Sequence, residues 1–166
     1  MSLPTPVRRY SHRPFPPYRY IPGRSPHPTR DPAGHSFGRE QSAGADIDLQ
    51  DWRHCEPYLY GVDLFNHGFW WEAHEAWECC WIAAGRTTET GFFLQGLIQV
   101  AAACLKNYQG HDRAAQRLAA EGLDKFPARD EMLLGIDTLR LKNGLKDYFL
   151  GKTDKSPFII LYNFHN

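Results

Sequence analysis

The sequence predicts an all-α fold, a compact multihelical bundle around a buried central helix, with an extended Pro-rich N-terminal arm. From about residue 46 onward, apolar residues recur with helical spacing and no strand pattern persists. The uncharged segment from Thr90 to Leu105 is apolar nearly all round, as expected of a helix buried on every side. Nine of the twelve prolines lie within residues 1–32, so this region cannot form regular helix or sheet.

Three parts are expected along the chain: a Pro/Arg-rich arm over residues 1–45, a helical domain over 46–155, and an extended apolar tail over 156–166. A chain of 166 residues with 42% hydrophobic content suits one domain rather than two. The arm carries seven arginines and two acidic residues, whereas the rest carries twelve basic and seventeen acidic residues. We therefore expect the arm to dock on its own body rather than on nucleic acid.

Aromatic side chains between the prolines refine this expectation for the arm. A pure linker would be poor in aromatic residues, whereas this segment interleaves them from Phe15 to Phe37. We expect the first dozen residues to be loose and residues 15–38 to lie extended across the helical body, partly ordered by it.

Residues that cap helix starts and glycines that end helices set the expected helix boundaries in the body. A short first helix begins at Asp46 or Asp48, and Gly68, Gly85 and Gly110 end later helices as left-handed residues. The expected helices then span residues 58–67, residues 69–84, Thr87 or Thr88 to about 109, residues 111–126, and a last helix that begins at a cap on Asp130. The tail is expected to pack on the body or on a neighbouring subunit.

The cysteines and the N-terminus indicate in which cellular compartment the protein is expected. The four cysteines form no CxxC pair, which excludes a disulfide framework and a zinc ribbon and predicts buried reduced thiols. The N-terminus has no apolar run typical of a secretory signal, and the longest uncharged run is too short to span a membrane. These features predict a soluble cytoplasmic protein that binds neither membrane nor nucleic acid.

The stretch FWWEAHEAWECCW, residues 69–81, holds four of the five tryptophans. On a helical wheel, His74 and Glu78 form an i, i+4 pair on the face richest in tryptophan, so both are expected to be largely buried and in contact. Glu75 flanks that face, and Glu72 lies nearly opposite, where it is expected to meet water. An unpaired carboxylate among apolar walls costs several kcal/mol, so Glu78 needs a partner.

The long central helix offers further partners for this pair. Gln95 and Gln99 share one side of it, next to the small residues Gly96 and Ala103. Small residues permit a close helix approach, so we expect the two amides to face His74 and Glu78.

Three interpretations of this polar cluster remain open. The first is a structural network that fixes the register of the helices. The second is an enzyme site, with His74, Glu75 and Glu78 as catalytic candidates and Gln95, Gln99 and Trp71 as ligand-binding candidates. The third is a metal site in which His74 and Glu78 take a third ligand from the arm, His27 or His35. The sequence HEAWE lacks the second histidine of a HExxH zinc motif, so no cofactor is assigned.

The stretch FNHGFWWEAHEAWECCW followed by FLQGLIQVAAACLKNYQG resembles the family catalogued as domain of unknown function 309, over roughly residues 58–126. The family pattern has an aromatic pair, then Glu-x-His-Glu, a further Glu three residues on, and a later Gln-Gly-x-x-Gln helix. The positions that match it are Glu72, His74, Glu75, Glu78, Gln95, Gly96 and Gln99. The resemblance implies a multihelical bundle around a buried central helix and no particular activity. The stretch PYRYIPGRSPHPTRDPAGHSFG is similar to an N-terminal extension of some members.

The functional expectation is accordingly a helical domain with a buried polar His/Glu/Gln site and no assigned activity. One alternative is a hydrolase, with or without a metal, that uses His74 and Glu78. Another is a protein-interaction module that binds through its arm and apolar tail. The expected partner is a small molecule or a protein, and a homodimer through the tail or an aromatic patch is a further alternative.

Overall fold

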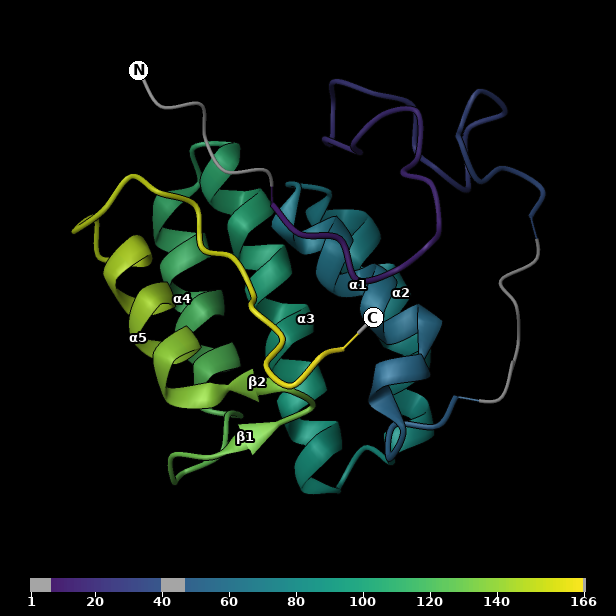
Figure 1. The fold of residues 1–166 in the computed structure, drawn as a ribbon. Helices are drawn as coiled ribbons and strands as arrows, with labels where there is room; N and C mark the ends of the chain where they lie inside the picture. The colour runs from purple at the N-terminus through teal and green to yellow at the C-terminus, as the bar shows by residue number, and fades with distance from the viewer. Residues whose placement is uncertain (1–6, 40–46, 166) are drawn as a thin grey trace, which may run out of the picture.

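The structure, a computed structural model, describes residues 7–39 and 47–165. Over these residues it contains five α-helices and one two-stranded sheet, which confirms the all-α prediction (Figure 1). The elements are the 3₁₀ helix η1 (Trp52–His54), α1 (Glu56–Asn66), α2 (Trp70–Ala84), α3 (Glu89–Tyr108), α4 (Asp112–Leu123), β1 (Met132–Leu133), β2 (Ile136–Asp137) and α5 (Thr138–Phe149). Among the described helices, none combines the length and the apolar character that crossing a bilayer demands.

The central helix is α3, as predicted. It packs against α2 on one side and α4 on the other, and α1 in turn packs against α2. Thr88 caps α3, because its hydroxyl accepts a hydrogen bond from the Gly91 amide at 3.0 Å. Apolar residues on several sides of α3 are buried, including Phe93, Leu97 and Cys104. A helix enclosed in this way needs apolar residues all round, which is the pattern that the sequence has.

Helices α3 and α4 approach each other closely at two glycines. A Cβ atom on Gly96 would lie 2.6 Å from the Gly122 carbonyl oxygen, and one on Gly122 would lie 2.9 Å from the Gly96 carbonyl oxygen. The small residues of α3 therefore face α4. The prediction that Gly96 lets α3 approach the helix of His74 and Glu78, which is α2, is wrong, because Gly96 faces α4.

The last helix begins later than predicted. Asp137, not Asp130, caps α5 by accepting a hydrogen bond from the Arg140 amide at 2.9 Å. The residues before it form a short antiparallel hairpin whose turn contains Leu134 at φ 50° and Gly135 at φ 77°. A helix cannot pass through two left-handed residues, so the residues that follow Asp130 form the hairpin rather than the first turns of the helix.

The beginning of the body also differs from the prediction. The first short helix is η1, a single 3₁₀ turn that begins at Trp52. Asp48 accepts hydrogen bonds from the amides of Gln50 and Asp51 at 2.9 and 3.4 Å, so it caps a turn just before η1. The other predicted cap, Asp46, lies outside the described residues.

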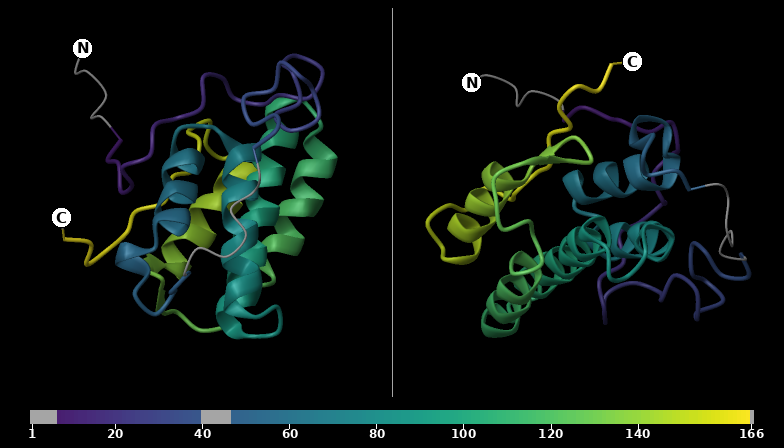
Figure 2. Two further views of the ribbon diagram at one scale, coloured as in Figure 1. Left: turned by 90° about the vertical axis from the view of Figure 1, so that its right-hand side faces the viewer. Right: turned by 90° about the horizontal axis from the view of Figure 1, so that it is seen from below.

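The described part of the arm forms a series of turns without helix or strand and passes in front of α1 before looping away (Figures 1 and 2). Within it Tyr10 and Ser11 are buried, which contradicts the expectation that the first dozen residues are loose, as far as these residues are described. The tail crosses in front of α3 and α4, and there Ile159 and Leu161 are buried. The Leu161 amide donates a hydrogen bond to the Tyr10 hydroxyl at 3.1 Å, so the arm and the tail contact each other.

The contact between α1 and α2 yields a test of this packing. Gly61 lies against the indole ring of the fully buried Trp77, and a Cβ atom on Gly61 would overlap that ring. We expect Gly61→Ala to lower the free energy of unfolding by about 1–3 kcal/mol, measured by urea denaturation, because the core cannot expand freely. Gly144→Ala in α5, which meets no heavy atom within 4 Å, is the matched control and should not destabilise the protein. Equal stability of Gly61→Ala and wild type would contradict the described contact.

Candidate functional site

Helix α2 turns one face to the core and leaves the others for polar contacts. Ala73, Trp77 and Cys80 are fully buried, and their spacing of four and three residues defines the core face. Trp77 also donates a hydrogen bond from its indole nitrogen to the Tyr58 carbonyl oxygen at 3.3 Å. His74 and Glu72 flank this core face on opposite sides, so each of them belongs to a different polar group.

The first polar group joins His74, Glu75 and Glu78. His74 Nδ1 lies 3.4 Å from Glu75 Oε1, and His74 Nε2 lies 3.4 Å from Glu78 Oε1. The side chains are 29%, 26% and 42% exposed, respectively. His74 and Glu78 are thus in reach of each other, but they are half-buried rather than largely buried, because Trp77 and Ala73 occupy the core face instead.

The carboxylates of Glu75 and Glu78 favour the protonated form of His74. Hydrogen bonding to Glu75 raises the pKa of His74 above its usual value, and the attraction of Glu78 adds to the effect, while partial burial opposes it. The protonated imidazole between two carboxylates therefore persists to higher pH than that of an isolated histidine. One ligand atom from each of the three residues lies within 4.8 Å of the other two.

The second polar group is centred on Glu72, which was expected to meet water. Glu72 is buried instead, and its Oε1 accepts hydrogen bonds from the Tyr20 amide at 2.7 Å and from His35 Nε2 at 3.0 Å. Both donors belong to the arm, which covers this side of α2. The expectation failed because a helical wheel shows which residues share a face but not which other segment covers it.

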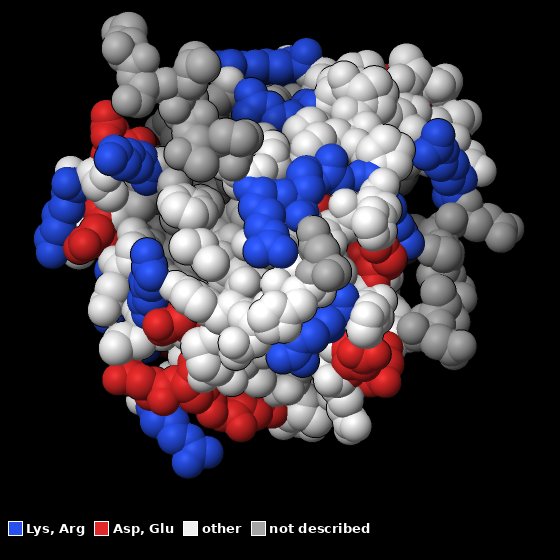
Figure 3. Space-filling view, in the orientation of Figure 1, with Lys and Arg blue, Asp and Glu red and all other residues white. Residues whose placement is uncertain are grey.

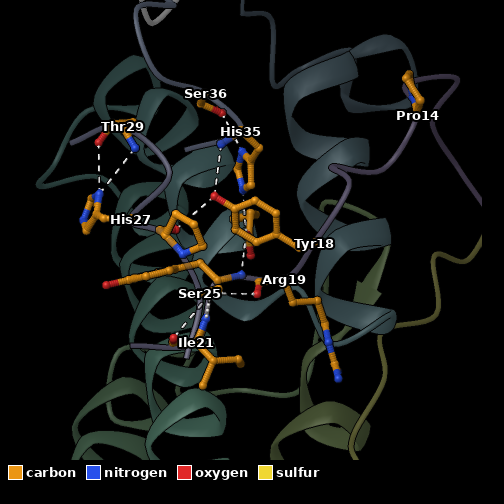
Figure 4. Close-up of polar contacts among 12 residues, drawn as sticks. Pro14, Tyr18, Arg19, Ile21, Ser25, His27, Thr29, His35 and Ser36 are labelled. Carbon is orange, nitrogen blue, oxygen red and sulfur yellow. Dashed lines mark hydrogen bonds and ion pairs between the residues drawn. The ribbon is translucent and has the colours of Figure 1, made fainter. Parts of the chain in front are cut away.

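The arm residues around His35 hold its ring in place (Figure 4). His35 Nδ1 lies 2.8 Å from the Ser36 hydroxyl, and the His35 amide donates to the Tyr18 hydroxyl at 3.0 Å. The Tyr18 hydroxyl in turn donates to the Pro26 carbonyl oxygen at 2.9 Å. These contacts direct His35 Nε2 toward Glu72.

A third polar residue, Asp63 in α1, was missed by the sequence analysis. Asp63 is fully buried, and its carboxylate accepts four hydrogen bonds from the arm. The donors are the Tyr10 amide at 2.8 Å, the Ser11 amide at 2.9 Å, the Ser11 hydroxyl at 2.6 Å and Arg9 Nε at 3.0 Å. The available signal was a single charge in the otherwise apolar run YLYGVDLF.

The other predicted candidates lie outside the His74 group. Trp71 packs edge-on against the rings of Tyr20 at 5.3 Å and His27 at 5.5 Å, so it serves the docking of the arm. His27 Nδ1 accepts hydrogen bonds from the backbone of Thr29 and Arg30. Neither predicted arm histidine joins His74, because His35 contacts Glu72 and His27 contacts Trp71. Over the described ranges, the group that could hold a metal ion takes its third ligand from Glu75.

The predicted glutamine partners do not reach the His74 group either. The Cβ atom of Gln99 lies 3.1 Å from where a Cβ on Gly122 would be, so Gln99 lies on the side of α3 that faces α4. Its Oε1 is buried and has no hydrogen-bond partner among the described residues. No described hydrogen bond links Gln95 or Gln99 to His74 or Glu78. The expected polar seam between α2 and α3 is thus absent from the described part of the chain.

Shallow surface hollows lie elsewhere. One, of about 430 Å³, is lined by residues from α3, α4 and the end of α5, including Asn107, Gln116 and Tyr148. A second, of about 400 Å³, lies at the start of α4 around His111. Neither is lined by His74, so these hollows offer no substrate pocket to the His74 group.

The four cysteines are free, as the sequence predicts, and three of them gather where α2 meets the start of α1. Hydrogen bonding with the Cys80 thiol lowers the pKa of Cys55 to about 7 and the pKa of Cys79 to about 7. Cys79 is partly exposed, whereas Cys55 and Cys80 are buried. Cys79 is therefore the thiol of this group that reagents in solution can reach as a thiolate.

The contacts of Glu72 yield a test of how the arm is held. Glu72→Ala strands the Tyr20 amide and the His35 ring, at a cost of about 1–3 kcal/mol. We expect faster trypsin cleavage at the arginines between residues 18 and 36 than in wild type, followed by mass spectrometry. Glu78→Ala, on the same helix but remote from these contacts, should leave the cleavage rate unchanged. Equal cleavage of all three proteins would show that Glu72 does not hold the arm.

Comparison with known proteins supports the resemblance drawn from the two motifs. The model of a family described as Domain of unknown function (DUF309) matches residues 58–118. No curated protein matches the chain. The matched segment runs from α1 to α4 and contains Asp63, Glu72 and the His74 group, whereas the arm and the tail lie outside it.

Proposed function

Residues 58–118 match the model of a family described as Domain of unknown function (DUF309), a description that names no activity, so we propose a function from the geometry of α2: the protein binds a divalent transition-metal ion. The ligands are His74, Glu75 and Glu78. The observation that carries the proposal is the convergence of one imidazole nitrogen and two carboxylate oxygens within 4.8 Å.

The ligand types determine which ions fit. An imidazole nitrogen with two carboxylate oxygens suits Zn²⁺, Co²⁺ or Ni²⁺, whereas Ca²⁺ and Mg²⁺ prefer oxygen ligands alone. Zinc bonds to nitrogen and oxygen are about 2.0–2.2 Å long, so the three side chains must close on the ion. The three side chains are partly exposed, so an ion can approach them from solvent. Three protein ligands would leave a further position for water, as in catalytic zinc sites.

The proton on His74 sets the pH dependence of binding. A histidine binds a metal only as the neutral imidazole, and the neighbouring carboxylates raise the pKa of His74. The ion must therefore displace a proton, and its affinity should increase as the pH rises through the pKa of His74. Because no described hollow is lined by His74, we propose metal binding without an assigned reaction.

The test is calorimetric titration of Zn²⁺ into the chelator-treated full-length protein at neutral pH. We expect one ion per chain, with affinity reduced about tenfold or more in Glu78→Gln and abolished in His74→Ala. His54→Ala is the matched control, because His54 is an exposed histidine that pairs with Asp51 away from the site. It should bind as wild type does.

The cysteine group is the competing site and needs its own control. Cys79→Ser should retain the affinity of wild type, because the proposed ligands include no sulfur. Wild-type affinity in His74→Ala, or lost affinity in Cys79→Ser, would contradict the proposed ligand set.

A second candidate function, protein interaction, is favoured by how the body holds its arm. Side chains on α1 and α2 bind backbone amides and side chains of an irregular segment, which is a way of recognising a peptide. We also propose a cytoplasmic location, which the four free cysteines support, because disulfides are rare in that compartment.

A further inference from the structure

We propose that α1 and α2 form a receptor for the arm of any copy of this chain, so that two copies can exchange arms and form a dimer. The receptor, which we call the arm-docking face, comprises Tyr60, Asp63, Phe69, Trp71 and Glu72. Its occupant is the segment of residues 8–21 from a second copy. The proposal is independent of metal binding, because none of these residues belongs to the His74 group.

The strongest contact of the arm-docking face is made by Asp63. A fully buried carboxylate needs hydrogen-bond donors, and the described donors to Asp63 Oδ1 and Oδ2 all come from Arg9, Tyr10 and Ser11. Two of them are backbone amides, and the others are a hydroxyl and a guanidinium. A second copy carries the same donors in the same order, so it can satisfy Asp63 equally well.

Further contacts follow the arm along the same face. The Tyr60 hydroxyl donates to the Pro14 carbonyl oxygen at 2.9 Å. Phe15 stacks on Phe69 with ring centroids 5.1 Å apart and planes 12° apart. Glu72 then accepts the Tyr20 amide. The arm-docking face therefore binds three separate points of one extended segment, which defines both its register and its direction.

The backbone of the arm is not woven into the helices, although Tyr10 and Ile21 contribute side chains to the hydrophobic core. Among the described residues, every backbone-to-backbone hydrogen bond of the arm lies within the arm, and none reaches the body. Attachment depends on side chains of the body, so the same contacts form whether or not the two segments belong to one chain.

Charge favours the same occupant. The arm is arginine-rich and the remainder of the chain is acidic, so an arm from a second copy is attracted to this body. On the face shown in Figure 3, Lys and Arg side chains gather at the centre and top, while acidic side chains gather at the lower edge.

The arm of the same chain competes with that of a second copy. A tethered segment has an effective concentration in the millimolar range, so the intramolecular contact prevails in dilute wild-type protein. Exchange becomes visible when the intramolecular contact is disabled, or when chains fold at high concentration.

The test uses two complementary full-length variants. The first, Tyr10→Ala with Ser11→Pro, has a defective arm and an intact arm-docking face. The second, Asp63→Leu, has an intact arm and a defective arm-docking face. Each alone should be a monomer of 19.1 kDa by light scattering, whereas their mixture should form a 1:1 dimer of twice that mass. A mixture that stays monomeric, although both variants are folded by circular dichroism, would overturn the proposal.

Wild-type protein provides a second measurement that does not depend on the variants folding. It is refolded from denaturant, with reductant present, at increasing protein concentration. We expect the dimer fraction to grow with the concentration at which the chains refold and to persist after dilution. A single monomeric species at every concentration, up to the millimolar range, would equally overturn the proposal.

Discussion

The buried carboxylate of Asp63 is the constraint on which the placement of the N-terminal third of the chain depends. A charge enclosed in protein is tolerated only when hydrogen-bond donors surround it, and α1 itself supplies none to this side chain. Arg9, Tyr10 and Ser11 supply all of the described donors. Tyr10, once placed, provides a surface for Leu161 and Phe164 of the tail. Asp63 thus holds the arm directly and, through Tyr10, contributes to a contact between the arm and the tail, which Asn66 also binds through Ile159.

Glu72 repeats this arrangement on the next helix, and the two together divide the surface of α2. One side of α2 is covered by the arm through Glu72 and Trp71, and another packs in the core through Trp77. His74, Glu75 and Glu78 remain on a side that stays partly exposed. This division explains why one short motif holds both structural and candidate ligand residues. Glu72 and Trp71 contact the arm, whereas the His74 group remains partly exposed to solvent.

Local sequence patterns predicted the helices well, because each depends on neighbouring residues. The apolar run of α3 indicated a buried helix, which the sequence placed between Thr87 or Thr88 and Gly110. The beginning of α5 was misplaced, since Asp130 and Asp137 are both residues of the kind that caps a helix, and the sequence does not show that the hairpin lies between them. The prediction that Gln99 faces His74 and Glu78 was wrong for a related reason. Small residues indicate that two helices approach each other closely, but they do not identify the two helices.

The contacts of the arm could not be predicted, because they join residues far apart in the sequence, such as Tyr10 with Asp63, 53 positions apart, and His35 with Glu72, 37 positions apart. Asp63 was missed, and a single charge within an apolar helix does not identify its partner in any case. Glu72 gave a misleading signal, since a residue opposite the tryptophans is exposed only if no other segment covers it. Proline content correctly excluded helix and sheet in the arm, but it carries no information about which side chains bind the arm.

Hydrogen exchange of individual backbone amides tests the central claim most directly. The amides of Tyr10, Ser11 and Tyr20 lie in a segment without helix or strand, and each donates to a buried carboxylate. The account predicts that these three exchange much more slowly than other amides of the arm, such as that of Arg13, which has no described acceptor. Exchange of all three at the rate of an unstructured peptide would show that the carboxylates do not hold the arm.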